Sequence, residues 1–432
     1  AITTGVQNTF IGGLAGDATT TTSNNTAVGF EALTTNTTGA SNSAVGRKAL
    51  SSNTTGHSNS AFGADLPGVV AGSALTANTT GLRNSAFGGS SLATNTTGDQ
   101  NTAVGAAALH LSTTADNNTA VGYNALRGNT TGAENTVVGA LAGDALTEAD
   151  FNVAVGVAAL SGDTLGSKST ALGYYALATQ NFTSATQVFN TAVGHSAGRQ
   201  ITTGVNNTLI GGLAGDALTD ADDNVAIGYA ALTRDTLGSN TVAIGKGVLA
   251  NQNFTSATDT YNTAVGHLAG AEVTTGVQNT LMGGLAGDAL TTGGNNVAVG
   301  HNALTTETGA SASVAIGKEA LRDQNVSSGS SYNVAVGFEA GKLVSTGIQN
   351  VIIGGLAGDA LTDSDYNTVV GYQALSSDTL GGRSTAIGYQ TLATQNFTSA
   401  TNAYNTAVGY SAGIAVTTGI ENVLIGGLAG DA

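Results

Sequence analysis

The sequence predicts an all-β protein, a parallel β-solenoid of about 24 coils with a 17-residue repeat. Three observations predict this fold. The motif Asn-Thr/Ser/Val-Ala-Val/Ile/Phe-Gly or a close variant recurs 24 times, and 18 of the 23 intervals between its glycines have the same length as the step from Gly12 to Gly29. Apolar residues return at fixed places in each interval, as stacked repeats require. Charged residues make up only 9% of the chain, far fewer than in a globular domain.

Each coil contains the same elements in the same order. The motif is a strand, because Val153 and Val155 alternate around the small Ala154. A second apolar pair follows, such as Ala32-Leu33, and then a turn such as Asn36-Thr37-Thr38-Gly39. We expect two or three strands of three to five residues in each coil. Coils stacked about 4.8 Å apart then pair every strand with its neighbours and bury a thin continuous core.

Two zones differ in what connects the coils. Residues 1–135 use Asn-Thr-Thr-Gly connectors, whereas residues 136–432 form a 72-residue super-repeat of four coils, as from Gly139 to Gly211. One step in each super-repeat is lengthened, and it begins at Gln180, Gln252, Gln324 or Gln395. The 25-residue step around Pro67 predicts a single protruding loop.

Charge and composition exclude several classes of partner. The net charge is −16 with only 12 Lys and Arg, whereas a nucleic-acid-binding protein needs a basic surface. No apolar run reaches the length of a membrane span, so no membrane insertion is expected in this segment. The chain has no cysteine, and therefore no disulfide or thiolate metal site. A single proline excludes collagen.

Acidic turns raise the question of a cofactor. Carboxylates recur in register, and calcium prefers several oxygen ligands from such loops. The calcium-binding nonapeptide pattern Gly-Gly-x-Gly-x-Asp is absent, however, so the sequence predicts no metal or other cofactor and assigns these acids to solvated turns. Ca²⁺ stays as the alternative, and its candidate ligands are Asp144, Asp216, Asp220, Asp222, Asp359 and Asp363.

The sequence predicts no catalytic residue, and we expect that the protein is not an enzyme. Its acids recur regularly, whereas a pair of catalytic carboxylates is placed once, across a cleft. The aromatic residues of the lengthened steps are instead candidates for a contact surface or for local caps on the core. These residues are Phe182, Phe254, Phe397, Tyr261 and Tyr404.

Some copies of the motif resemble a known family. Ser313-Val314-Ala315-Ile316-Gly317 and Thr241-Val242-Ala243-Ile244-Gly245 are similar to the head repeats of trimeric autotransporter adhesins (YadA-like, hemagglutinin-type), and the wider array is similar to phage tail fibres. The resemblance covers the whole chain. It implies a left-handed parallel β-roll that assembles as a homotrimer and acts in surface attachment. The adhesin coil is shorter than the coil of this chain, so a three-sided helix of the hexapeptide acyltransferase kind stays the alternative.

We therefore expect a non-enzymatic structural or adhesive fibre segment that is extracellular, on a cell surface or a virion. The alternative is a filament subunit that self-assembles head to tail, since residues 3–18 nearly match residues 417–432. A phage tail-fibre shaft that binds glycan is a further alternative, as is an ice-binding solenoid with stacked threonine pairs. The expected partners are other copies of the chain and a glycan or protein of a host surface. The threonine pairs begin at Thr37, Thr54, Thr79, Thr96 and Thr130.

Overall fold

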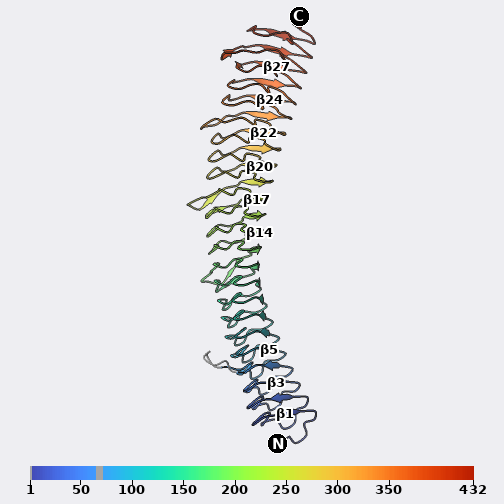
Figure 1. Ribbon diagram of the computed structural model, residues 1–432, viewed down its shortest axis with the longest axis vertical. Coiled ribbons are helices and arrows are strands. Elements are labelled where there is room, and N and C mark those ends of the chain that lie inside the picture. Colours follow the sequence, from blue (N-terminus) through green and yellow to red (C-terminus); the bar gives the residue numbers. More distant parts are fainter. Residues whose placement is uncertain (1, 65–71) are drawn as a thin grey trace. The chain divides into compact units, whose positions relative to one another are not determined.

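The computed structural model describes residues 2–64 and 72–432, and within them it contains strands and turns but no helix (Figure 1). The chain divides into two compact units, unit 1 (Ala1–Asp220) and unit 2 (Ala221–Ala432). Each unit is a parallel β-solenoid of twelve coils, with one three-residue strand in each coil. The predicted fold class, the 17-residue repeat and the 24 coils are thereby confirmed.

The strands of unit 1 carry the repeated motif, with alanine at the centre of most of them. They are β1 (Thr9–Ile11), β2 (Thr26–Val28), β3 (Ser43–Val45), β4 (Ser60–Phe62), β5 (Ser85–Phe87), β6 (Thr102–Val104), β7 (Thr119–Val121), β8 (Thr136–Val138), β9 (Val153–Val155), β11 (Thr170–Leu172), β13 (Thr191–Val193) and β14 (Thr208–Ile210).

The strands of unit 2 follow the same pattern. They are β15 (Val225–Ile227), β17 (Val242–Ile244), β19 (Thr263–Val265), β20 (Thr280–Met282), β21 (Val297–Val299), β22 (Val314–Ile316), β23 (Val334–Val336), β24 (Val351–Ile353), β25 (Thr368–Val370), β27 (Thr385–Ile387), β29 (Thr406–Val408) and β30 (Val423–Ile425).

The core of each unit lies between this sheet and the turns that close the coils. Neighbouring strands pair in parallel with equivalent residues opposite each other, as Ala27 is opposite Ala44 in β2 and β3. The middle residue of the strand faces inward, and Ala27 and Ala44 are completely buried. Leu33 and Leu50 fill the rest of the core and are also completely buried.

The expectation of two or three strands of three to five residues per coil is wrong, because each described coil has one three-residue strand and the second strand of some coils has only two residues. The second apolar pair lies in a turn, where Leu33 has a φ of 52° and Glu31 a φ of 58°. Left-handed backbone costs a non-glycine residue roughly 1 kcal/mol, and burying the leucine side chain offsets that cost. With one such strand in each described coil, the three strand-bearing sides of an acyltransferase-type helix are not formed.

The glycine that ends each motif is required by the backbone. Gly46 follows β3 with a φ of +128°, and a Cβ there would lie 2.6 Å from the carbonyl oxygen of Gly63 in the next coil. L-residues avoid that φ, and the coil spacing leaves no room for a side chain. Gly46 therefore permits both the sharp exit from the strand and the close stacking of coils.

A buried asparagine ladder holds successive coils in register. The backbone N–H of Asn42 donates to Oδ1 of Asn25 at 3.0 Å, and Nδ2 of Asn42 donates to the carbonyl of Gly56 at 2.9 Å. Asn59 repeats the arrangement on Asn42. Buried amides need such partners, and the ladder supplies them coil by coil.

Three of the lengthened steps add a short second sheet. The pairs are β10 (Gly166–Ser167) with β12 (Thr186–Gln187), β16 (Gly238–Ser239) with β18 (Thr258–Asp259), and β26 (Gly381–Gly382) with β28 (Thr401–Asn402). In the remaining step Ser311 and Ser330 form a single bridge. The predicted Pro67 protrusion lies outside the described residues. The sequence zones 1–135 and 136–432 differ in these steps but share the same coil.

Candidate functional site

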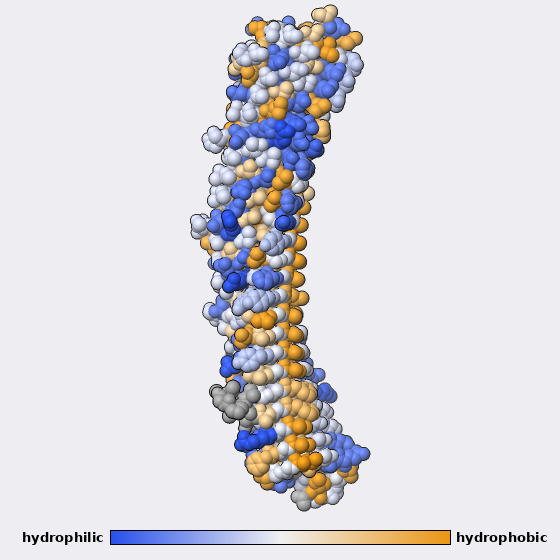
Figure 2. Space-filling view, viewed as in Figure 1, coloured by the Kyte–Doolittle hydropathy of each residue, from blue (hydrophilic) through white to orange (hydrophobic). Residues whose placement is uncertain are grey.

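In each unit, the outward face of the sheet formed by the three-residue strands is free of charge. None of the residues in the twelve such strands of either unit is Lys, Arg, Asp or Glu, although the chain has 12 Lys and Arg and 28 Asp and Glu. The first residue of each strand is Thr, Ser or Val, and the third is an aliphatic residue, Phe or Met. Both point away from the core. Figure 2 shows hydrophobic side chains gathered in a narrow column along much of unit 1.

The apolar side chain at the third strand position is partly exposed in every coil. In unit 1, Val104 is 38% and Val138 36% exposed, and Phe87 is 40% exposed. Phe62 and Phe87 stack on this face with ring centroids 4.9 Å apart. In unit 2, Ile316 is 38% exposed. We call the outward first and third strand residues of each unit the uncharged face.

Polar and aromatic side chains border the uncharged face on both sides. One column follows the motif glycine, and in it Tyr372, Tyr389 and Tyr410 are exposed and stack with centroids 5.8 and 5.2 Å apart. The other column precedes the motif asparagine and contains Lys168 and Arg383. An apolar centre with a polar, aromatic rim is the usual anatomy of a protein interface.

Three of the five predicted contact aromatics do not reach the surface. Phe182 and Phe254 are 7% exposed and Phe397 is 6% exposed, so their assignment to a surface contact is wrong. The ring of Phe397 packs against Gly381 in the preceding coil, where a Cβ would lie 2.7 Å from the ring. These three residues cap the core locally. Tyr261 and Tyr404 are 57% and 51% exposed.

Sequence reasoning missed a buried acid that organises each lengthened step. Asp163 is completely buried and accepts hydrogen bonds from Nε2 of Gln180 at 2.5 Å and from the backbone N–H groups of Gly166 and Phe182 at 3.1 and 3.0 Å. In the first zone the equivalent position is an asparagine, as in Asn36. The change from asparagine to an acid in the coil before each lengthened step is the feature of the sequence that could have revealed this buried acid. The other pairs are Asp235–Gln252, Glu307–Gln324 and Asp378–Gln395.

The calcium candidates do not form a site. In the part of the chain that the structure describes, no group of three or more His, Asp or Glu lies close enough to hold a metal ion. Asp220 and Asp363 instead accept hydrogen bonds from the hydroxyls of Thr203 and Thr346, each at 2.6 Å. Asp216 and Asp222 join no such group.

Two of the calcium candidates, Asp144 and Asp359, are partly buried. Burial raises the pKa of Asp144 above its ordinary value, and burial does the same for the pKa of Asp359. Oδ1 of Asp359 is buried without a hydrogen-bond partner among the described residues. A partly desolvated carboxylate that belongs to no group of three acids is a poor calcium ligand.

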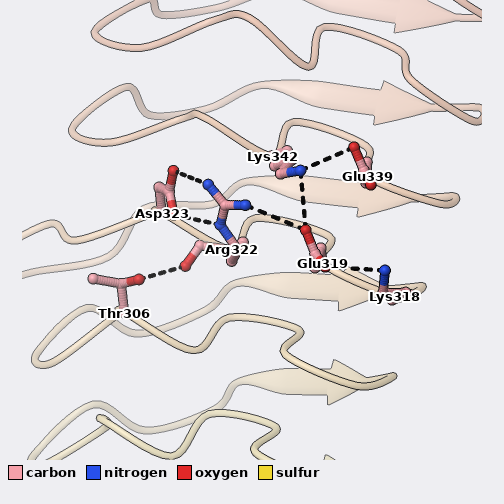
Figure 3. Close-up of polar contacts among 7 residues, drawn as sticks. All are labelled: Thr306, Lys318, Glu319, Arg322, Asp323, Glu339 and Lys342. Atoms are coloured by element: carbon pink, nitrogen blue, oxygen red, sulfur yellow. Dashed lines mark hydrogen bonds and ion pairs between the residues drawn. The ribbon is translucent and has the colours of Figure 1, made fainter.

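One cluster of charges spans two coils of unit 2 (Figure 3). Glu319 lies 3.0 Å from Nζ of Lys342, 3.1 Å from Nζ of Lys318 and 3.2 Å from Arg322, which also pairs with Asp323. Hydrogen bonds from Lys342 and Lys318 lower the pKa of Glu319 to about 2. The cluster joins the coils of β22 and β23 beside the step that lacks a second sheet.

The threonine pairs are only partly available to ice. The hydroxyl of Thr37 donates to the carbonyl of Thr54 at 3.0 Å, and the first threonine of each later pair donates to the next coil in the same way. The first threonine hydroxyl of each pair therefore donates its hydrogen bond to the next coil and not to ice. Thr38 and Thr55 remain exposed.

Comparison of the chain with models of protein families, with curated proteins and with solved structures gives no match. Across residues 2–64 and 72–432, no helix is long and apolar enough to cross a membrane.

Proposed function

We propose that this chain is a non-enzymatic, extracellular segment of a structural or adhesive fibre, which associates with further copies through the uncharged face. The observation that carries the proposal is the absence of charged residues from the three-residue strands of both units, although the outward side chains of these strands are partly exposed. A sheet face meant only for water accepts Lys, Glu and Asn, and this one has none.

Burial of the uncharged face supplies the driving force. Covering a valine or isoleucine that is about one-third exposed stabilises an interface by on the order of 0.5–1 kcal/mol. Each unit repeats an outward apolar residue at this position twelve times in register, and most of these residues are valine or isoleucine. Contiguous apolar patches of this kind mark interaction surfaces, and a repeated surface lets many weak contacts add along the chain.

Side-by-side association of three copies agrees with the adhesin resemblance, and a cell or virion surface is the proposed location. Because the same coil recurs, the surface repeats with it, and a repeated surface is suited to structure and attachment. A host protein or glycan is the proposed external partner.

The test is the oligomeric state of the full chain by analytical ultracentrifugation. We expect an oligomer of defined size for the wild type. The double variant Val104→Glu/Val138→Glu should raise its dissociation constant at least about tenfold, because it places unpaired charges in an apolar interface. A matched control, Thr38→Glu/Thr55→Glu, adds the same charge at exposed turn residues and should leave the oligomer intact.

Other outcomes separate the alternatives. A monomeric wild type at all accessible concentrations would contradict the proposed association. Open-ended polymers in electron micrographs, unaffected by the two valine substitutions, would favour head-to-tail assembly. A monomer that shows thermal hysteresis would favour ice binding.

A further inference from the structure

Two hollows lie at equivalent places in two copies of the super-repeat. The hollow in unit 1 has a volume of about 260 Å³ and is bordered by Asp150, Phe151, Ser167, Lys168, Thr186 and Gln187. The hollow in unit 2, of about 230 Å³, is bordered at the corresponding positions by Asp365, Tyr366, Gly382, Arg383, Thr401 and Asn402. The offset along the sequence is the same for all six pairs of positions.

The lengthened step builds each hollow. Its second strand, β12 or β28, pairs with β10 or β26 and forms one wall. The loop before that strand is held from inside by the buried pair Asp163–Gln180 in unit 1 and by Asp378–Gln395 in unit 2. The walls are therefore positioned by fully hydrogen-bonded buried groups.

Both hollows present the same four kinds of group. A half-exposed aromatic ring, Phe151 or Tyr366, stands beside a carboxylate, Asp150 or Asp365. The next coil adds a cation, Lys168 or Arg383, and the coil after it adds an amide, Gln187 or Asn402. The four kinds of group recur although the ring, the cation and the amide each belong to a different residue type in the two hollows.

In each hollow the cation is positioned by an amide oxygen and an aromatic ring, and not by a carboxylate. Lys168 donates to Oε1 of Gln187 at 3.1 Å and lies 5.2 Å from the ring centroid of Phe189. Arg383 donates to Oδ1 of Asn402 at 2.9 Å and lies 4.7 Å from the ring centroid of Tyr366. Neither cation has an ion pair with a carboxylate within the described ranges. Each therefore keeps N–H groups to donate to a ligand.

The carboxylates also keep acceptor capacity. Oδ1 of Asp150 accepts from the backbone N–H of Ala133 at 2.7 Å, and Oδ1 of Asp365 accepts from Ile348 at 2.8 Å. An ionised carboxylate has about four acceptor sites, so hydrogen bonds from ligand hydroxyls remain possible. The carboxylate of each hollow also repels an anionic ligand. This repulsion is stronger in unit 2, where Asp363 adds a second carboxylate.

We propose that each hollow binds one pyranose ring of a neutral saccharide. An aromatic face offers apolar contact to the C–H face of the ring, and an acid with a neighbouring cation accepts from and donates to its hydroxyls. The volumes suit a single small ring, since drug-sized ligands need about 300–1,000 Å³.

The next copy of the super-repeat supplies an internal comparison. There Asp223 stands in the place of Phe151, Asn240 in the place of Lys168 and Asp259 in the place of Gln187. Nδ2 of Asn240 donates to Oδ1 of Asp259 at 2.9 Å. This copy has the second sheet, β16 with β18, but neither the ring nor the cation, so we expect no binding there.

The saccharide would be a ligand of the proposed adhesive fibre, and the hollows lie in the column beside the uncharged face, outside the strand residues that form that face. The test is saturation-transfer NMR of the full chain with neutral gluco-, manno- and galacto-oligosaccharides, and with a glucuronate oligomer as the charged comparison. We expect saturation of at least one neutral oligomer with a dissociation constant of about 1 mM, and little saturation of the glucuronate.

Variants assign the binding to the hollows. Phe151→Ala/Tyr366→Ala should abolish the saturation, and Lys168→Asn/Arg383→Asn should weaken binding at least about fivefold. Tyr261 is an exposed tyrosine in the column that precedes the motif asparagine, and it borders neither hollow. Tyr261→Ala should therefore leave the saturation unchanged. No saturation by any neutral oligomer, preference for the glucuronate, or undiminished saturation in the Phe151/Tyr366 variant would each overturn the inference. Sedimentation of the same samples reports self-association separately.

Discussion

The side-chain amide of Gln180 donates a 2.5 Å hydrogen bond to the buried carboxylate of Asp163, one coil earlier in the solenoid. Gln180 in turn accepts from Nδ2 of Asn190 at 3.0 Å, and Asp163 accepts from two backbone N–H groups. The pair thereby connects the asparagine ladder to the lengthened step. A charged group in the core is tolerated here because donors surround it.

Replacing Asp163 by Asn should loosen the lengthened step of unit 1. The new amide group carries two donors where Gln180, Gly166 and Phe182 already donate, so one or more buried N–H groups lose an acceptor. The cost is about 1–3 kcal/mol. Native-state hydrogen exchange should show the amides of Gly166 and Phe182 exchanging at least about fivefold faster. Asp220→Asn, at an exposed acid, is the control; unchanged exchange in Asp163→Asn would contradict the role given to the carboxylate.

Replacing Ser112 by Asn should stabilise unit 1. Asn53, Asn78 and Asn95 form a second buried ladder, in which Nδ2 of each donates to Oδ1 of the asparagine one coil earlier. Ser112 stands at the next position and is too short, so Oδ1 of Asn95 and Oγ of Ser112 are buried without a partner among the described residues. Restoring the amide should add about 1 kcal/mol and raise the melting temperature.

Ser112→Ala separates the two contributions to that effect. It removes the unpaired hydroxyl without completing the ladder, so its melting temperature should rise less than that of Ser112→Asn. An equal rise in both variants would show that the ladder is not the cause.

The charge cluster of unit 2 should lose its stabilising effect in acid. Hydrogen bonds from Lys342 and Lys318 lower the folded-state pKa of Glu319 to about 2 from an ordinary 4.5. Since the folded pKa is depressed, the contribution is fully present above pH 4.5 and is lost as the pH falls from 4.5 toward 2. The melting temperature of the wild type should fall more steeply over that window than that of Glu319→Gln. Parallel curves for the two proteins would contradict this prediction.

Replacing Gly46 by Ala should disrupt the stacking of two coils. The added Cβ would meet the carbonyl of Gly63 at 2.6 Å in a backbone with a φ of +128°. Gly329 has a φ of +91° but nothing within 4 Å of an added Cβ, so Gly329→Ala measures the conformational cost alone, about 1–3 kcal/mol. Thermal unfolding should show a larger loss for Gly46→Ala. Equal losses would mean that close approach of the coils is not what requires glycine.

The role of the aromatic residues could be predicted only in part. The recurrence of Phe182 and Tyr261 in lengthened steps marked those steps as special, and the structure places a second sheet in three of the four. The pattern could not say which ring is buried, because Phe and Tyr occur both in cores and on surfaces. Burial depends on Gly166 and Gly381 leaving space for a ring from the next coil, and that contact joins residues far apart in the sequence.

By itself the sequence determined the period, the number of coils, the parallel stacking and the position of the strand, because a repeat of fixed length can bury its apolar residues only against its neighbours. The tertiary structure decided which apolar residues face inward. Alternation defines two faces of a strand such as Val153–Val155 without saying which is buried, and both faces are apolar here. In most coils alanine takes the inward position beside the buried leucine, as Ala154 does, and the larger Val153 and Val155 turn outward into the uncharged face, whereas Leu209 and Ile352 are buried at the same position of other coils.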